Sequence, residues 1–283
     1  MLRFDRVLRA ASNLSILVFA VVSMLSAGLS VTLRQIATPF RRPARIVRAI
    51  VANFVLVPLL AAGIAHVLAL DPARSIGLIL LGTAAGAPFL IKLIAIAAGD
   101  VALGTSLLVL LVPLTVVLMP FLVPVLAPEA AVTAGAVAVP LATSLLVPLA
   151  LGLVIAERAP RWATLLKPAA RVASTIALIA LMLSTIVLNV HHVVAIMQSR
   201  ALAAVVLLVV GSFAIGYALA SPRPERRVVL GLGTAQRNIA AATIVAIEDI
   251  KDNDTLVLVV VASIIDLIIL IPLARWLRPG GAT

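Results

Sequence analysis

The chain has 283 residues, of which 63% are hydrophobic and only 12% are charged. An ordinary soluble domain carries about twice that charged fraction, so the composition excludes a soluble globular protein. The net charge of +11 then indicates basic loops at a membrane surface rather than a nucleic-acid partner. Because the chain contains no Cys, disulfides and thiolate metal sites are excluded, and its three His are too scattered to predict a metal site.

Charges, Pro and Gly interrupt the hydropathy and divide the chain into nine expected spans of roughly 20 or more residues, the length that a bilayer requires. The expected spans are 12–32, 49–70, 75–98, 101–127, 131–156, 168–190, 200–220, 226–247 and 255–276. Basic residues precede the first span as they do in a signal peptide, but its apolar run continues past Leu29. We therefore predict an all-α polytopic membrane protein that forms one domain over residues 1–283, with a basic surface segment from Arg34 to Arg48.

Lys and Arg are distributed unevenly between the two sides of these spans. Fourteen of them fall on the side that holds the C-terminus and six on the side that holds the N-terminus, while Lys92 and Arg237 fall inside spans. Cytoplasmic loops carry the excess of Lys and Arg, so we expect a cytoplasmic C-terminus and an outside N-terminus. This predicts a multi-pass protein of the bacterial inner membrane.

Two short strings recur along the chain. Leu81-Gly82-Thr83-Ala84 returns as Leu232-Gly233-Thr234-Ala235, and Ile94-Ala95-Ile96 is echoed at the same offset by Val245-Ala246-Ile247. The copies lie on the third and eighth spans, five crossings apart, so they run in opposite directions. We interpret residues 12–127 as a shortened first repeat and residues 131–276 as a second, inverted repeat, a plan that recurs in secondary transporters.

Both echoed spans are interrupted near their centres. Gly86-Ala87-Pro88 interrupts the third span, where Pro removes a backbone hydrogen bond, and Gln236-Arg237-Asn238 interrupts the eighth. Taken singly, the first is equally consistent with a plain Pro kink and the second with a polar contact between helices. Broken helices at matching places in two inverted halves indicate a binding site at the membrane midplane, and we expect the breaks to be adjacent in space.

Three charged residues fall within the expected spans, where each is costly unless it is paired or hydrated. Lys92 lies one turn beyond Pro88, Arg237 lies in the second break, and Asp266 lies in the last span. Alternatives are that Lys92 snorkels to an interface and that Asp266 forms a buried salt bridge with Lys92 or Arg237. Two cations against one anion predict a net positive cavity that suits a carboxylate or sulfonate.

These segments resemble the bile acid:sodium symporter family. The resemblance is carried by Gly86-Ala87-Pro88, by Gly99-Asp100-Val101-Ala102-Leu103, by Gln236-Arg237-Asn238-Ile239-Ala240-Ala241-Ala242, and by Val31-Thr32-Leu33 followed by Arg41-Arg42-Pro43. It implies two inverted repeats arranged as a core and a panel domain, with two discontinuous helices that cross in the core beside the sodium and organic-anion sites. Some members have nine spans with the N-terminus outside, which implies a core of spans 2–4 and 7–9 and a panel of spans 1, 5 and 6.

The chain departs from the family at the positions implied to bind sodium. These positions hold Leu90 and Ile91 on the first crossing helix, Gly104 and Leu108 on the next helix, and Leu232 in place of an acidic residue. Gln236 matches the family, and Asn53 stands where many members have Gln. Related arsenite exporters depend on a Cys, which this chain lacks. The departures predict transport without sodium, with Lys92 in the electrostatic role of the missing cation.

We therefore predict a secondary transporter of a small organic anion that works by alternating access and is not an enzyme. Pro88, Lys92, Arg237 and Asn238 are the expected substrate-binding residues. Gln236, Asn53 and Asp266 are the expected ion-coupling residues. The expected partners are the anion and the lipid bilayer, with no nucleic acid, protein partner or cofactor implied. Ordinary sodium-coupled symport is one alternative, and a channel or membrane-embedded receptor is another.

Overall fold

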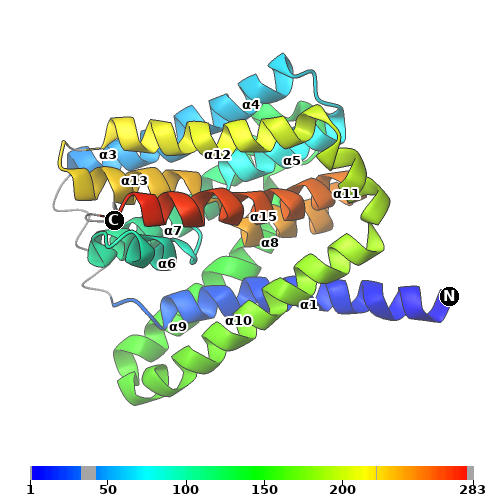
Figure 1. Cartoon of the computed structure of the whole chain (residues 1–283). Coiled ribbons are helices and arrows are strands. Elements are labelled where there is room, and N and C mark those ends of the chain that lie inside the picture. The colour runs from blue at the N-terminus through cyan, green and yellow to red at the C-terminus, as the bar shows by residue number, and fades with distance from the viewer. Residues whose placement is uncertain (1, 33–42, 221, 279–283) are drawn as a thin grey trace.

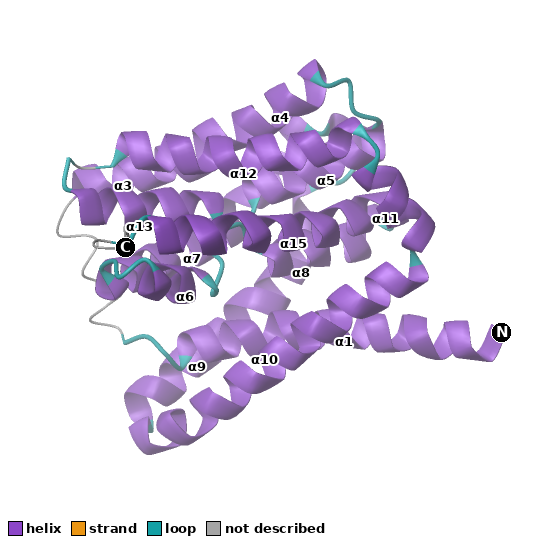
Figure 2. Ribbon diagram, in the orientation of Figure 1, coloured by secondary structure: helices purple, strands orange, loops and turns teal. Residues whose placement is uncertain are grey.

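The computed structural model describes residues 2–32, 43–220 and 222–278, and within these ranges every regular element is a helix (Figures 1 and 2). The elements are α1 (Leu2–Gly28), α3 (Pro43–Ile50), η2 (Val51–Leu56), α4 (Val57–Val67), α5 (Pro72–Thr83), α6 (Leu90–Ile96), α7 (Val101–Leu126), η3 (Pro128–Ala130), α8 (Ala134–Leu141), η4 (Ala142–Leu146), α9 (Val147–Arg158), α10 (Pro160–Leu188), α11 (Val190–Met197), α12 (Arg200–Leu219), α13 (Pro224–Ala235), α14 (Ile239–Val245), η5 (Ala246–Ile250) and α15 (Asn253–Trp276). Most of the expected basic surface segment, including Arg41 and Arg42, lies outside the described residues.

Seven helices in the described part of the chain are long and apolar enough to cross a membrane. They are Pro43–Val67, Val101–Leu126, Ala134–Arg158, Pro160–Leu188, Arg200–Leu219, Pro224–Ile250 and Asn253–Trp276. The other two expected spans correspond to α1, whose described apolar stretch is Leu17–Gly28, and to α5 with α6, each of which is too short to cross alone. The all-α polytopic membrane class is confirmed, whereas the count of nine spans stays a prediction.

Short acidic side chains begin three of the helices that surround the centre of the molecule. Asp71, Asp100 and Asp252 each accept a hydrogen bond from the backbone N–H three residues later, at 3.1, 2.9 and 2.9 Å. These bonds satisfy N–H groups that have no partner inside the first helical turn. The local sequence thus fixes where α5, α7 and α15 begin.

Two of the spans contain a π-helical turn that ends two residues before a proline. η2 leads into Pro58 at the start of α4, and η4 leads into Pro148 at the start of α9. Proline has no N–H to donate and its ring clashes with the preceding turn, so a wider turn relieves the clash without ending the span. In η2 the wider turn carries Asn53, whose side chain is fully buried.

The helices form two groups. α1, α9 and α10 pack on one another and make a layer along one side of the molecule (Figure 1). The larger group contains α4, α5, α12, α13, α14 and α15, and the layer meets it where α1 contacts α14 and α10 contacts α15. This layer includes the expected spans 1 and 6 and the second half of span 5, while the assignment of core and panel domains stays a prediction.

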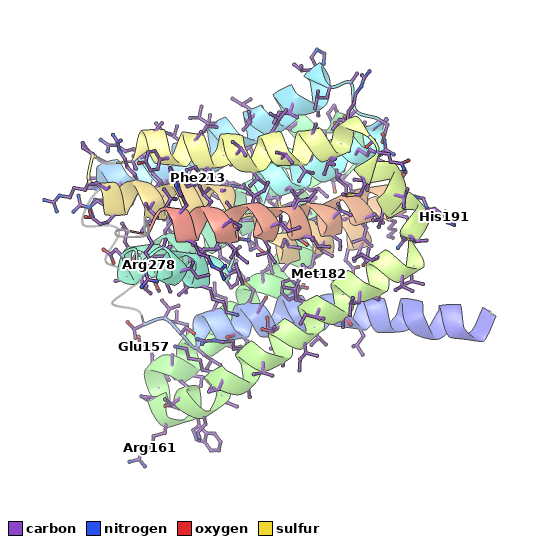
Figure 3. The ribbon with its side chains drawn as sticks, viewed as in Figure 1. Glu157, Arg161, Met182, His191, Phe213 and Arg278 are labelled. Atoms are coloured by element: carbon purple, nitrogen blue, oxygen red, sulfur yellow. The ribbon has the colours of Figure 1, made fainter. Side chains whose placement is uncertain are left out.

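The two ends of the helix bundle carry different side chains. Figure 3 shows Arg161 and Arg278 at one end of the molecule and His191 at the opposite end. The distribution of Lys and Arg placed Arg161 and Arg278 on one side of the membrane, in agreement with this arrangement. Which end faces the cytoplasm stays a prediction.

Candidate functional site

The first helix break follows α5. Ala84 is extended (φ −85°, ψ 90°), and Gly86 has a φ of +81°, a conformation that favours glycine. A Cβ on Gly86 would also lie only 2.9 Å from the backbone nitrogen of Val112 in α7. Thr115, also in α7, accepts from the Ala85 N–H at 3.0 Å and donates to the Ala85 carbonyl at 2.9 Å. The break is therefore a fixed structure held by α7 rather than a simple kink at Pro88.

The second helix break lies between α13 and α14, and it contacts the first directly. The backbone N–H of Asn238 donates to the Ala84 carbonyl at 2.8 Å, and its side-chain Nδ2 donates to the Gly86 carbonyl at 3.1 Å. The Asn238 Oδ1 also accepts from the Ala241 N–H at 3.2 Å and so begins α14. The expectation that both helices are interrupted, and that the interruptions are adjacent, is confirmed.

Arg237 is buried between the two breaks and is only 3% exposed. Its Nε donates to the Leu81 carbonyl at 2.8 Å, and its Nη2 donates to the Gly82 carbonyl. Its Nη1 donates to the Thr234 carbonyl at 3.0 Å and to Asn53 Oδ1 at 3.1 Å. Four of the five guanidinium donors are therefore occupied by protein oxygens, which leaves one donor for any other ligand.

A cavity of about 320 Å³ lies between the two breaks and the layer of α1 and α10. All four expected substrate-binding residues line this cavity, and so does one of the three expected ion-coupling residues. These five are Pro88, Lys92, Gln236, Arg237 and Asn238. The cavity volume lies at the small end of the range of ligand sites.

Asn53 and Asp266, the two remaining expected site residues, do not line the main cavity. The Oδ1 of Asn53 accepts a hydrogen bond from Arg237, and its Nδ2 donates to Thr234 Oγ1 at 3.3 Å. Asp266 is 4% exposed and lines a separate cavity of about 10 Å³ beside Arg237. Its carboxylate oxygens have no hydrogen-bond partner within 3.5 Å among the described residues, although Gln236 and Arg237 are close enough to interact with it electrostatically.

The structure contains neither of the salt bridges considered for Asp266. In the described part of the chain, no nitrogen of Lys92 or Arg237 lies within 4.0 Å of its carboxylate. Lys92 is exposed in the cavity, and its Nζ lies 5.5 Å from the ring centre of Phe89. Arg237 pairs with carbonyl oxygens instead, because the ends of two helices offer them at hydrogen-bond distance.

Sequence reasoning missed the wall of the cavity that faces the breaks. This wall consists of hydroxyl side chains and one cation: Ser23 and Ser26 of α1, Ser30 in the turn after α1, and Arg171, Ser174 and Thr175 of α10. Ser23 and Ser26 are three residues apart, and Arg171 precedes Ser174 and Thr175 by three and four residues, spacings that place each group on one face of its helix. That spacing was a usable signal, since such hydroxyl residues stand out in an apolar span.

The cavity lining combines positive charge with apolar surface. Lys92 and Arg171 supply exposed cations, and no described lining residue is acidic. Apolar side chains complete the wall: Phe19, Phe89, Ile91, Leu108, Leu178, Ile239 and Leu267. Such a lining suits a small molecule that has one anionic group and an apolar body.

A family model described as the sodium bile acid symporter family matches residues 16–199, about two thirds of the chain. The chain belongs to this family. No curated protein matches it. The matched region includes the first helix break, α1 from residue 16 onward, α10 and the cavity residues that they contribute, and it ends before the second break. The expected family membership is confirmed, and the site lies in a membrane protein of the sodium bile acid symporter family.

In this symporter-family chain, the residues at the positions that the resemblance implied for sodium ligands have no side-chain oxygen. Leu90 and Leu232 are fully buried, and Leu108 lines the cavity with an apolar side chain. A Cβ on Gly104 would lie 2.1 Å from an isoleucine side chain, so no larger residue fits there without a shift. No cluster of His, Cys, Asp and Glu in the described residues has the arrangement of a metal site.

Proposed function

We propose that this protein is a secondary transporter of a small organic anion, and that the anion binds in the cavity between the helix breaks and the layer of α1 and α10. The observation that carries the proposal is the combination of Lys92 and Arg171 with apolar walls and no described acidic lining residue. A cation at a partly dehydrated site attracts an anion more strongly than it does in bulk water. The apolar walls favour an organic anion over a hydrated inorganic ion.

Within this proposal the two sides of the cavity have different parts. Lys92 and Asn238 belong to the broken helices, whereas Arg171 and the hydroxyl side chains belong to the layer of α1 and α10. A ligand that contacts both sides stabilises one relative position of the two groups, which is the requirement for a ligand-linked conformational change. Alternating access then consists of a movement of this layer against the broken helices.

The cavity lies towards one end of the bundle. Ser30 in the turn after α1, Ala95 near the end of α6 and Arg171 in the first half of α10 all line it. The distribution of Lys and Arg assigns this end to the cytoplasm. We therefore interpret the structure as an inward-facing state.

Sodium-coupled symport is the second candidate, and one observation favours it. The Oε1 of Gln236 and both carboxylate oxygens of Asp266 are buried and have no hydrogen-bond partner in the described part of the chain. Oxygen atoms of this kind are what a sodium ion or a proton requires. In this alternative Gln236, Asn53 and Asp266 couple transport to the ion.

Uptake into vesicles tests the proposed function. Purified protein is reconstituted into liposomes, and a panel of radiolabelled carboxylates and sulfonates is offered under sodium, proton or no gradient. We expect at least one anion to accumulate above its outside concentration, because a secondary transporter couples two movements. A channel only equilibrates its solute, so uptake that stops at equal concentrations under every gradient contradicts the proposal.

A further inference from the structure

The oxygens around Arg237 come from the ends of two different helices. Leu81 and Gly82 lie in the last turn of α5, and Thr234 lies in the last turn of α13. Asn53 adds a side-chain oxygen from η2. We call these four oxygens the carbonyl cradle, and together they surround one buried positive charge.

The carbonyl cradle requires a cation for electrostatic reasons. The last carbonyls of a helix have no partner within that helix, and the helix dipole gives this end a partial negative charge. Here two such ends, those of α5 and α13, meet inside the protein rather than in water. Without a positive charge between them, the Leu81 carbonyl would keep only the N–H of Ala84, at 3.3 Å, and the Gly82 and Thr234 carbonyls would have no hydrogen-bond partner among the described residues. The partial negative charges of the two helix ends would also repel each other.

We propose that the guanidinium of Arg237 is a resident cation that fills the carbonyl cradle permanently and joins the two broken helices without a dissolved ion. The inference rests on the proposed transport function and specifies its coupling: anion transport by this chain does not require sodium. A dissolved cation must be bound and released in each cycle, whereas a side chain remains in place. Arg237 thus acts as a positioning residue for the two breaks.

The structure assigns this role to Arg237 rather than to Lys92, which the sequence favoured. Lys92 is exposed in the cavity, and its described contact is with the ring of Phe89. Arg237 is 3% exposed and donates to all four oxygens of the carbonyl cradle. The two cations therefore have different roles: Lys92 is available to bind the substrate, and Arg237 binds oxygens of the protein itself.

Thermal unfolding of the purified protein tests the resident cation independently of transport. We compare wild type with Arg237→Ala in choline chloride, and we add guanidinium chloride or sodium chloride at low millimolar concentration with choline keeping the ionic strength constant. We expect Arg237→Ala to melt about 5 °C or more below wild type, since it leaves the carbonyl cradle empty. Guanidinium or sodium should recover part of the loss in the variant, because a bound ligand raises apparent stability, and should leave wild type unchanged.

Two further variants keep the test decisive if Arg237→Ala does not fold. Arg237→Lys retains a positive charge, whereas Arg237→Met retains the length without the charge, so we expect Lys to be the more stable of the two. Arg161→Met removes an exposed arginine at the start of α10 and serves as the control, with an unchanged Tm. Equal stability of the Lys and Met variants would overturn the proposal.

The response of wild type to sodium separates this inference from the proposed function. If sodium raises the Tm of wild type as much as that of Arg237→Ala, the carbonyl cradle is not what binds the ion, and the resident cation is excluded. If an anion accumulates in vesicles only with sodium, transport holds and the inference fails. If the anion is taken up equally in sodium and in choline, both the proposed transport function and the inference are supported.

Discussion

Gly86 shows how one residue determines the shape of the site. Its φ of +81° and the 2.9 Å approach of its added Cβ to the Val112 nitrogen leave no room for a side chain. The carbonyl of Gly86 also accepts the hydrogen bond from the Asn238 side chain, which joins the two breaks. A change of backbone conformation at this position would therefore also affect the second break, because the Gly86 carbonyl is bonded to Asn238.

Gly86→Ala should reduce stability by about 1–3 kcal/mol, because alanine is strained at this φ and its Cβ meets the α7 backbone. Gly63→Ala is the matched control: an added Cβ there has no atom of the described residues within 4 Å, and alanine favours the helix α4 in which it lies. Chemical or thermal unfolding of the purified proteins measures both changes. A Gly86→Ala variant as stable as Gly63→Ala would show that the first break tolerates a different backbone conformation.

The broken helices illustrate what sequence predicts at the scale of an element. Gly86-Ala87-Pro88 and Gln236-Arg237-Asn238 stand out because each interrupts an apolar run, and both breaks are present. The contacts that hold the breaks were not predictable in the same way. The role of Thr115 depends on which turn of α7 faces Ala85, and this is decided by packing rather than by a local pattern.

Interactions between distant helices explain the other differences from the sequence predictions. Lys92, Arg237 and Asp266 were identified as buried-charge candidates, yet their pairing depends on distances that hydropathy does not contain. The guanidinium of Arg237 lies closer to backbone carbonyl oxygens than to the carboxylate of Asp266. The salt bridges considered from the sequence therefore did not include its actual partners. The hydroxyl wall was missed because α1 and α10 become neighbours of the breaks only in the folded protein.

Thr115→Val tests whether α7 holds the first break. The substitution preserves the shape of the side chain but leaves the buried Ala85 N–H and carbonyl without the partner that they have in wild type. We expect a loss of about 1–3 kcal/mol of stability. Thr143→Val is the control, because Thr143 is exposed and bonds only to carbonyls of its own helical segment; a similar loss in both variants would assign the effect to helix propensity instead.

At the scale of the whole molecule, the two helix groups enclose a cavity that neither could form alone. The layer of α1 and α10 supplies hydroxyl groups and Arg171, and the broken helices supply Lys92 and the polar residues of the second break. The chain belongs to a family described as symporters, which is consistent with a transporter. Binding of an organic anion in this cavity is the central claim of our account.

Protection of a cysteine placed in the cavity wall tests this claim most directly. The chain contains no Cys, so Ser174→Cys gives a single thiol in the cavity, and Gln198→Cys gives an exposed thiol outside it as the control. The rate of thiol modification is measured with a panel of carboxylates and sulfonates and with their neutral amide counterparts. We predict that anions slow modification at residue 174 but not at residue 198, and that Lys92→Ala removes the protection. Equal protection by the amides, or protection that survives in Lys92→Ala, would contradict an anion site in this cavity.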